Sequence, residues 1–86
     1  IWIDLRKPEQ FKEGHIIQAR NMLLSEIKKK GPAFFKSKIL ILVCANGSDS
    51  SRATAQLRDS GFLRTVALDG GMNTWNQFGF PITRKG

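Results

Sequence analysis

The cysteine at position 44 is the only one in this chain of 86 residues, and its context suits a reactive sulfur. A run of strand-forming residues, 39–43, ends directly on it, a short polar loop covers 45–49, and a helical pattern follows. This order directs backbone N–H groups and the positive end of a helix dipole toward the loop. A thiolate would be stabilised there. The sequence therefore predicts a nucleophilic cysteine, with an inert buried cysteine as the alternative.

Other residues whose side chains could take part in catalysis have more ordinary explanations. Asp4 and Arg6 lie two positions apart on one predicted strand, which favours a structural ion pair over an acid–base pair. His15 follows Gly14 and has no neighbours at ligand spacing, so we expect a structural role rather than a general base. One cysteine and one histidine are too few to predict a metal site, and no disulfide can form within the chain.

Composition indicates one small globular domain. The hydrophobic content is 41%, the net charge is +7 and the pI is about 10.2. The cations are scattered apart from one cluster at 28–30, and no zinc-finger or ribonucleoprotein signature accompanies them, so we expect no specific nucleic-acid site. A basic face lying near a membrane stays open as an alternative.

Two features of the chain bear on where it comes from. No apolar run reaches the roughly 20 residues of a membrane helix, and no signal peptide is recognisable. The chain opens without Met on a strand-like run, which we interpret as a segment of a longer protein.

The elements that must position the cysteine alternate between strands and helices. We predict strands at 1–5, 19–22, 38–43 and 65–68. Helices are expected at 8–12, at 27–30 with Ser25 as the cap, at 51–60 ending on Gly61, and over the residues spaced from Met72 to Phe78. The pair Gly31-Pro32 is expected to stop the second helix. This alternation predicts a three-layer α/β fold, with a mostly parallel sheet flanked by helices on both faces.

Several motifs in this order resemble those of the rhodanese-like domains, from residue 1 to about residue 82. They are Asp4-Leu5-Arg6 with Gly14-His15-Ile16, Ala19-Arg20-Asn21, Cys44-Ala45-Asn46-Gly47 with Ser50 and Ala53, and Gly61-Phe62 with Gly70-Gly71, Trp75, Gly79 and Pro81. The resemblance implies a single rhodanese-like domain over 1–86 that lacks the family's first strand and helix.

The resemblance further implies sulfur transfer without a cofactor. Cys44 would be the nucleophile and would carry sulfur as a persulfide between a small-molecule or protein donor and a thiophilic acceptor. The terminal sulfur would be cradled by the backbone N–H groups of the loop, namely Ala45, Asn46, Gly47, Ser48, Asp49 and Ser50. A loop of six residues goes with sulfur in this superfamily, and the arginine that a tyrosine phosphatase needs is replaced by Ser50.

Asp49 departs from the family pattern, because many active members carry arginine there. A carboxylate would raise the pKa of Cys44 and repel thiosulfate, since two unit charges near a surface interact by about 1–4 kcal/mol. We therefore expect a persulfide donor in preference to thiosulfate. Asp49 could also act as the helix N-cap. Arg52, one turn into the helix, is expected to point away from the loop.

Gly70 and Gly71 are expected to turn the chain beside the loop, and Trp75 to pack in the core. We expect a monomer in the cytoplasm, and anchoring to the inner face of a membrane by a segment outside this sequence stays open. The alternative function is a catalytically weak or inactive rhodanese fold, used as a regulatory or protein-binding module.

Overall fold

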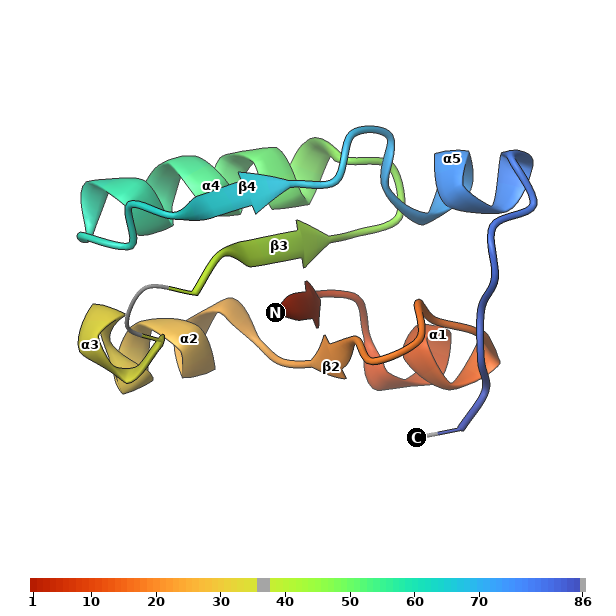
Figure 1. Ribbon diagram of the computed structural model, residues 1–86, viewed down its shortest axis with the longest axis horizontal. Helices are drawn as coiled ribbons and strands as arrows, with labels where there is room; N and C mark the ends of the chain where they lie inside the picture. Colours follow the sequence, from red (N-terminus) through yellow and green to blue (C-terminus); the bar gives the residue numbers. More distant parts are fainter. Residues whose placement is uncertain (36–37, 86) are drawn as a thin grey trace.

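The computed structural model describes residues 1–35 and 38–85. Its elements follow one another as β1 (Trp2–Asp4), α1 (Pro8–Glu13), β2 (Arg20–Asn21), α2 (Leu24–Lys30), α3 (Pro32–Phe35), β3 (Leu40–Val43), α4 (Ser48–Asp59), β4 (Thr65–Ala67) and α5 (Gly71–Gln77). The four strands form one sheet in the order β2-β1-β3-β4, and every pairing is parallel. All strands therefore point the same way, and their carboxyl ends meet near α1 and α5 (Figure 1).

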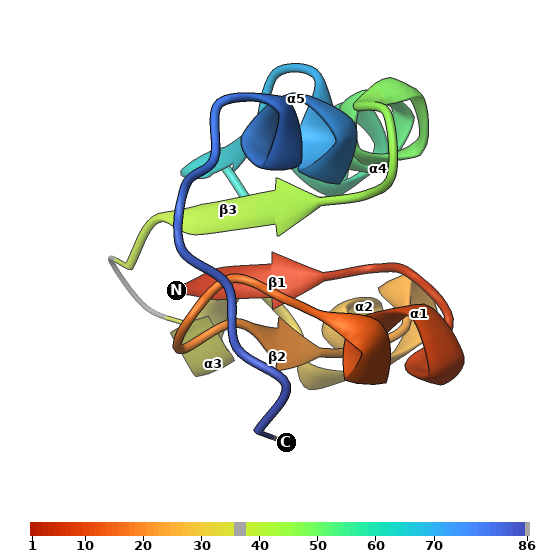
Figure 2. The ribbon, with the colours of Figure 1, turned by 90° about the vertical axis from the view of Figure 1, so that its right-hand side faces the viewer.

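Helices cover both faces of this sheet, which confirms the predicted three-layer α/β fold (Figure 2). On one face, Ile3, Leu40 and Leu42 pack against α2, α3 and α4. On the other, Val43 packs with Ile16 and with Met72 of α5. The alternation of Leu42 and Val43 between two apolar layers explains why the central strand is apolar along its whole length.

Strand β3 places the cysteine. It is paired on both sides, with β1 and with β4, and Leu42 and Val43 are fully buried. A strand held in this way has a fixed register, so the residue that follows Val43 is held at the carboxyl edge of the sheet. The pairing of β3 with β4 continues one residue beyond β4, because the N–H of Leu68 donates to the carbonyl of Leu42 at 2.9 Å.

Helix α4 begins at Ser48, three residues before the predicted start. Gly47 is the N-cap and has a left-handed backbone (φ 90°), a conformation that glycine adopts without strain. The predicted end is confirmed, since Gly61 has a positive φ of 96°. The N–H of Gly61 donates to the carbonyl of Arg58, and the N–H of Phe62 donates to the carbonyl of Leu57 at 2.9 Å. This pair of bonds is the Schellman motif, with Phe62 and Leu57 in one apolar cluster.

The second helix ends at Lys30 with Gly31 as its C-cap, as predicted, but its expected start was wrong. The N-cap of α2 is Leu23 rather than Ser25, and its N–H donates to the carboxylate of Glu26 at 2.9 Å. Pro32 opens a further short helix, α3, which the sequence did not predict. Proline suits the first position of a helix because its missing N–H needs no partner there.

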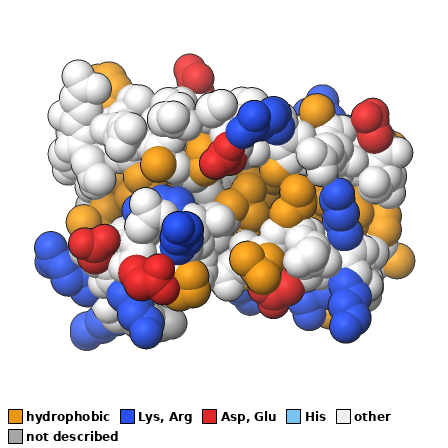
Figure 3. All heavy atoms as spheres, turned by 180° about the vertical axis from the view of Figure 1, so that it is seen from behind, with side chains coloured by type: hydrophobic (Ala, Val, Ile, Leu, Met, Phe, Trp, Pro, Cys, Tyr) orange, Lys and Arg blue, Asp and Glu red, His pale blue; other side chains and the backbone are white. Residues whose placement is uncertain are grey.

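Hydrophobic side chains also remain at the surface between charged ones, as Figure 3 shows for the face seen from behind. Phe34, Ile39 and Leu63 are more than half exposed, with exposures of 57%, 52% and 75%. In the described part of the chain, no helix is both long enough and apolar enough to cross a membrane.

Candidate active site

The sulfur of Cys44 lies inside the curl of the loop between β3 and α4. Backbone N–H groups of Gly47 and Ser50 donate to Sγ at 3.0 and 3.3 Å. The residue is only 3% exposed. Both donors belong to the cap and first turn of α4, so the sulfur also lies at the positive end of the helix dipole. The loop is therefore built to favour negative charge on sulfur.

The hydroxyl of Ser50 is a further contact of this sulfur, with Oγ 3.2 Å from Sγ. Ser50 is fully buried, and its Oγ is also 3.2 Å from the carbonyl oxygen of Gly47. When Cys44 is a thiol, S–H donates to Oγ and the serine O–H donates to that carbonyl. When Cys44 is a thiolate, the same O–H can rotate to donate to sulfur, because a hydroxyl both donates and accepts.

These contacts lower the pKa of the Cys44 thiol. Burial is the largest single influence and acts in the opposite direction, because it penalises the charged form. The Ser50 hydroxyl and the N–H groups of Ser50, Gly47 and Asn46 together outweigh it. The net result is a cysteine that ionises more readily than an ordinary one.

The loop is held in shape from two sides. Within it, the Asn46 side-chain oxygen accepts the N–H of Ser48 at 3.0 Å. From α5, the N–H groups of Met72 and Asn73 donate to the carbonyls of Cys44 and Ala45, both at 2.8 Å. The first turn of α5 thus fixes the carbonyls of Cys44 and Ala45, while the N–H groups of Gly47 and Ser50 donate to the sulfur.

Gly70 and Gly71 make this close approach possible. A Cβ on Gly71 would lie 2.3 Å from the carbonyl oxygen of Cys44, and one on Gly47 would lie 2.9 Å from the nitrogen of Gly70. Both distances are shorter than any stable contact, so the two loops meet backbone to backbone. The predicted turn beside the cysteine is therefore present and in direct contact with it.

Asp49 is arranged differently from either expectation. It is the second residue of α4, whose N-cap is Gly47, so the N-cap assignment was wrong. Its carboxylate forms an ion pair with Arg52, and both side chains are 72% exposed. Arg52 therefore turns toward Asp49 rather than away. Asp49 is not among the groups that shift the pKa of Cys44, which is lowered, so the expected rise in that pKa was also wrong.

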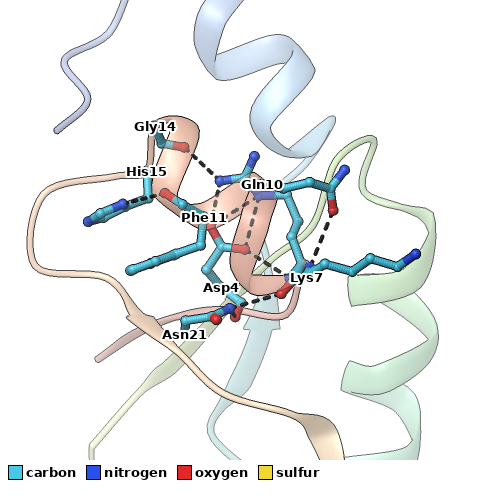
Figure 4. A network of polar contacts seen from close by, with 8 residues as sticks. Asp4, Lys7, Gln10, Phe11, Gly14, His15 and Asn21 are labelled. Carbon is cyan, nitrogen blue, oxygen red and sulfur yellow. Dashed lines mark hydrogen bonds and ion pairs between the residues drawn. The ribbon is translucent and has the colours of Figure 1, made fainter. Parts of the chain in front are cut away.

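A second polar network supports the end of β1 (Figure 4). Asp4 is fully buried, and its carboxylate accepts hydrogen bonds from Nε and Nη2 of Arg6, the second at 2.8 Å. The expected ion pair is therefore present. Arg6 also donates to the carbonyl of Gly14 at 2.7 Å. The amide of Asn21 donates to the carbonyls of Asp4 and Arg6 at 3.0 and 2.9 Å. This network joins β1, β2 and the end of α1, and buries a charge that is paired and hydrogen-bonded.

The two remaining support residues pack rather than face the sulfur. His15 is 2% exposed, stacks on Phe11 with ring centroids 3.6 Å apart, and bonds the carbonyl of Phe11 through Nδ1 at 2.7 Å. Trp75 is half-buried, and its Nε1 donates to the carbonyl of Pro81 at 3.0 Å. It also meets the ring of Trp2 edge to face, with centroids 5.9 Å apart.

The chain thus has a parallel sheet flanked by helices, with a cysteine loop at the carboxyl edge of the sheet. Comparison with known proteins identifies the family to which this fold belongs. Residues 1–78 match the family described as the rhodanese-like domain. The chain belongs to this family. A rhodanese-related protein from Thermoplasma volcanium has the same fold, with a TM-score of 0.84 and 27% identity over 98% of this chain and 83% of its own.

Relatives at the sequence level point the same way. YqhL of Bacillus subtilis is 38% identical over 73 residues, which are 85% of this chain and 58% of YqhL. The thiosulfate sulfurtransferase GlpE of Stutzerimonas stutzeri is 33% identical, over 85% of this chain and 67% of GlpE. Other relatives at about 30% identity are also named sulfurtransferases, so the chain falls in a sulfurtransferase family. It spans about half the length of the first relatives it matches.

Proposed function

We propose that this domain transfers sulfane sulfur through a persulfide on Cys44. The observation that carries the proposal is the position of Sγ among the Gly47 and Ser50 N–H groups and the Ser50 hydroxyl, which together lower its pKa. These contacts suit a thiolate that must act as nucleophile in one half-reaction and as leaving group in the next.

The first half-reaction is attack by the Cys44 thiolate on the outer sulfur of a donor persulfide. A new S–S bond forms to Sγ, the donor's own S–S bond breaks, and the donor thiolate departs with the electron pair. In the second half-reaction, a thiophilic acceptor attacks the outer sulfur and Cys44 leaves as thiolate. No net oxidant or reductant is needed, because each step exchanges one bond to sulfur for another.

The outer sulfur of the intermediate is anionic and stands about 2 Å beyond Sγ, the length of an S–S bond. Gly47 and Ser50 already donate to Sγ, and the N–H of Ser48 is taken by Asn46. In the described part of the chain, the N–H groups of Ala45 and Asp49 have no hydrogen-bond partner. We propose that these two bind the outer sulfur together with the N–H of Asn46, within the cradle predicted from the sequence.

The pair formed by Asp49 and Arg52 bears on the donor. It is neutral as a whole, and the guanidinium that could attract a dianion such as thiosulfate is already paired. We therefore propose a low-molecular-weight or protein persulfide as the donor, in preference to thiosulfate. The basis is local charge complementarity at the loop.

A transfer assay with cyanide as the acceptor tests both points. Cys44→Ala should abolish transfer from every donor. Asp49→Arg should raise the turnover of thiosulfate. Turnover of a low-molecular-weight persulfide should stay within about twofold of the wild-type value, because only exposed and screened charges change. Unchanged thiosulfate turnover would refute the charge argument. Residual transfer in Cys44→Ala would refute the proposal, and an inactive but well-folded wild-type chain would favour the binding-module alternative.

A further inference from the structure

The end of the molecule farthest from Cys44 combines positive charge with exposed apolar side chains. It is formed where the amino ends of β3 and β4 meet α2 and α3, on the left in Figure 1. We call this surface the basic tip. Its members are Lys28, Lys29, Lys30, Phe34, Lys38, Ile39, Leu63 and Arg64.

Direct contacts and a shared hollow link several members of the basic tip. The Lys30 ammonium lies 4.5 Å from the centre of the Phe34 ring, and Phe34 contacts Phe35 edge to face. Phe35, Lys38, Leu63 and Arg64 line one open hollow of about 230 Å³. Lys30, Phe34, Lys38, Leu63 and Arg64 therefore lie close together, although they come from three separate parts of the chain.

The basic tip is rich in cations, and few acids lie near it. Five of its members are cationic, and the acids on the adjoining helices are Glu26 and Asp59. The Glu26 carboxylate is engaged with the N–H of Leu23 at the start of α2. The other five of the seven acids lie on elements at the carboxyl end of the sheet: Asp4, Glu9, Glu13, Asp49 and Asp69.

The apolar members of the tip are unusual for a surface that only meets water. Phe34, Ile39 and Leu63 are each more than half exposed, and they stand among lysines. Aliphatic side chains such as Ile39 and Leu63 offer no face for stacking on bases and no group for hydrogen bonding to them. They do partition into the headgroup boundary of a bilayer, where neighbouring lysines meet anionic lipid.

We infer that the basic tip docks on an anionic lipid surface, with Phe34, Ile39 and Leu63 entering the headgroup region and the lysines binding lipid phosphates. The strands run away from the tip, so the loop that carries Cys44 lies on the side that faces solvent (Figure 1). A membrane-docked domain would thus keep its sulfur site accessible to partners. This inference concerns a surface separate from the cysteine and is independent of the proposed function.

Sedimentation with sucrose-loaded vesicles tests the inference. The chain should pellet with a mixture of phosphatidylcholine and phosphatidylglycerol, roughly 2:1, and not with phosphatidylcholine alone. Each lysine at an anionic surface contributes about a fivefold factor, so Lys29→Gln/Lys30→Gln should weaken binding roughly 25-fold. Leu63→Ser should weaken it further, and binding should fall as salt rises.

The matched control is Lys12→Gln/Lys85→Gln, which removes the same charge from outside the tip. It should change binding by less than about threefold, since distant charges are screened. All four lysines are exposed, so thermal melting should be similar in both double variants. Equal losses in the two pairs, or no pelleting of the wild-type chain with anionic vesicles, would overturn the inference. Retention on single-stranded RNA without vesicle binding would assign the surface to nucleic acid and overturn it as well.

Discussion

Replacing Ser50 by alanine removes the hydroxyl that contacts the Cys44 sulfur at 3.2 Å while leaving the backbone donors in place. Ser50 is fully buried inside the first turn of α4, where alanine has a high helix propensity. The variant is therefore expected to fold, and the loss of one oxygen atom leaves only a small cavity. What changes is the stability of the thiolate relative to the thiol.

The size of the change follows from the strength of the lost contact. A hydrogen bond to a charged group contributes about 1.5–3 kcal/mol, more than the weak bond that the neutral thiol makes to the same hydroxyl. The ratio of thiolate to thiol at a given pH should therefore fall about tenfold to a hundredfold in Ser50→Ala. Burial of the sulfur continues to oppose ionisation and is no longer outweighed to the same degree.

The assay is the rate of alkylation of Cys44 by iodoacetamide as a function of pH. The midpoint of this profile should move to higher pH in Ser50→Ala, with the same limiting rate at alkaline pH. Ser50→Thr keeps the hydroxyl and should restore much of the wild-type profile. A midpoint that does not move in a well-folded Ser50→Ala would refute the role given to the hydroxyl.

Three other results follow from the same structure. Arg6→Met should lower the free energy of unfolding in urea by about 3–5 kcal/mol, because it leaves the buried Asp4 carboxylate without its ion-pair partner. Arg52→Met at the exposed ion pair should lower it by less than about 1 kcal/mol. Gly71→Ala should depress the melting temperature and the reactivity of Cys44 far more than Gly79→Ala, since both have positive φ but only Gly71 approaches another backbone; equal effects would contradict the contact. Because the pKa of Cys44 is lower in the folded chain than its ordinary value, the free energy of unfolding should rise with pH between the folded and the unfolded pKa. This contribution should be lost below the folded pKa. Cys44→Ala should abolish this rise, and denaturant titrations at several pH values would show it.

Local sequence patterns predicted the fold class and the placement of Cys44, because each depends on residues close together in the chain. The apolar run before Cys44 and the Gly61 signal after α4 are of this kind. The start of α4 was predicted too late because Gly47 caps the helix through its backbone alone. Helix α3 was missed because proline both ends and begins helices, and the sequence did not show which applied to Pro32.

Contacts between distant residues were harder to predict. The side chain of Asn21 donates to carbonyls 15 and 17 positions away, and no local pattern in the sequence predicted these contacts. The ion pair of Asp49 and Arg52 follows the usual three-residue helix spacing, but the late predicted start of the helix hid it. The Gly70-Gly71 pair was predicted to turn the chain beside the loop of Cys44, and the structure confirms this close approach.

The most direct test of the central claim is intact mass spectrometry of the reduced chain after incubation with a low-molecular-weight persulfide. The account predicts a mass increase of one sulfur atom that disappears on treatment with cyanide and does not occur in Cys44→Ala. A folded wild-type chain that gains no sulfur, or a gain that persists in Cys44→Ala, would contradict the claim that Cys44 carries sulfur as a persulfide.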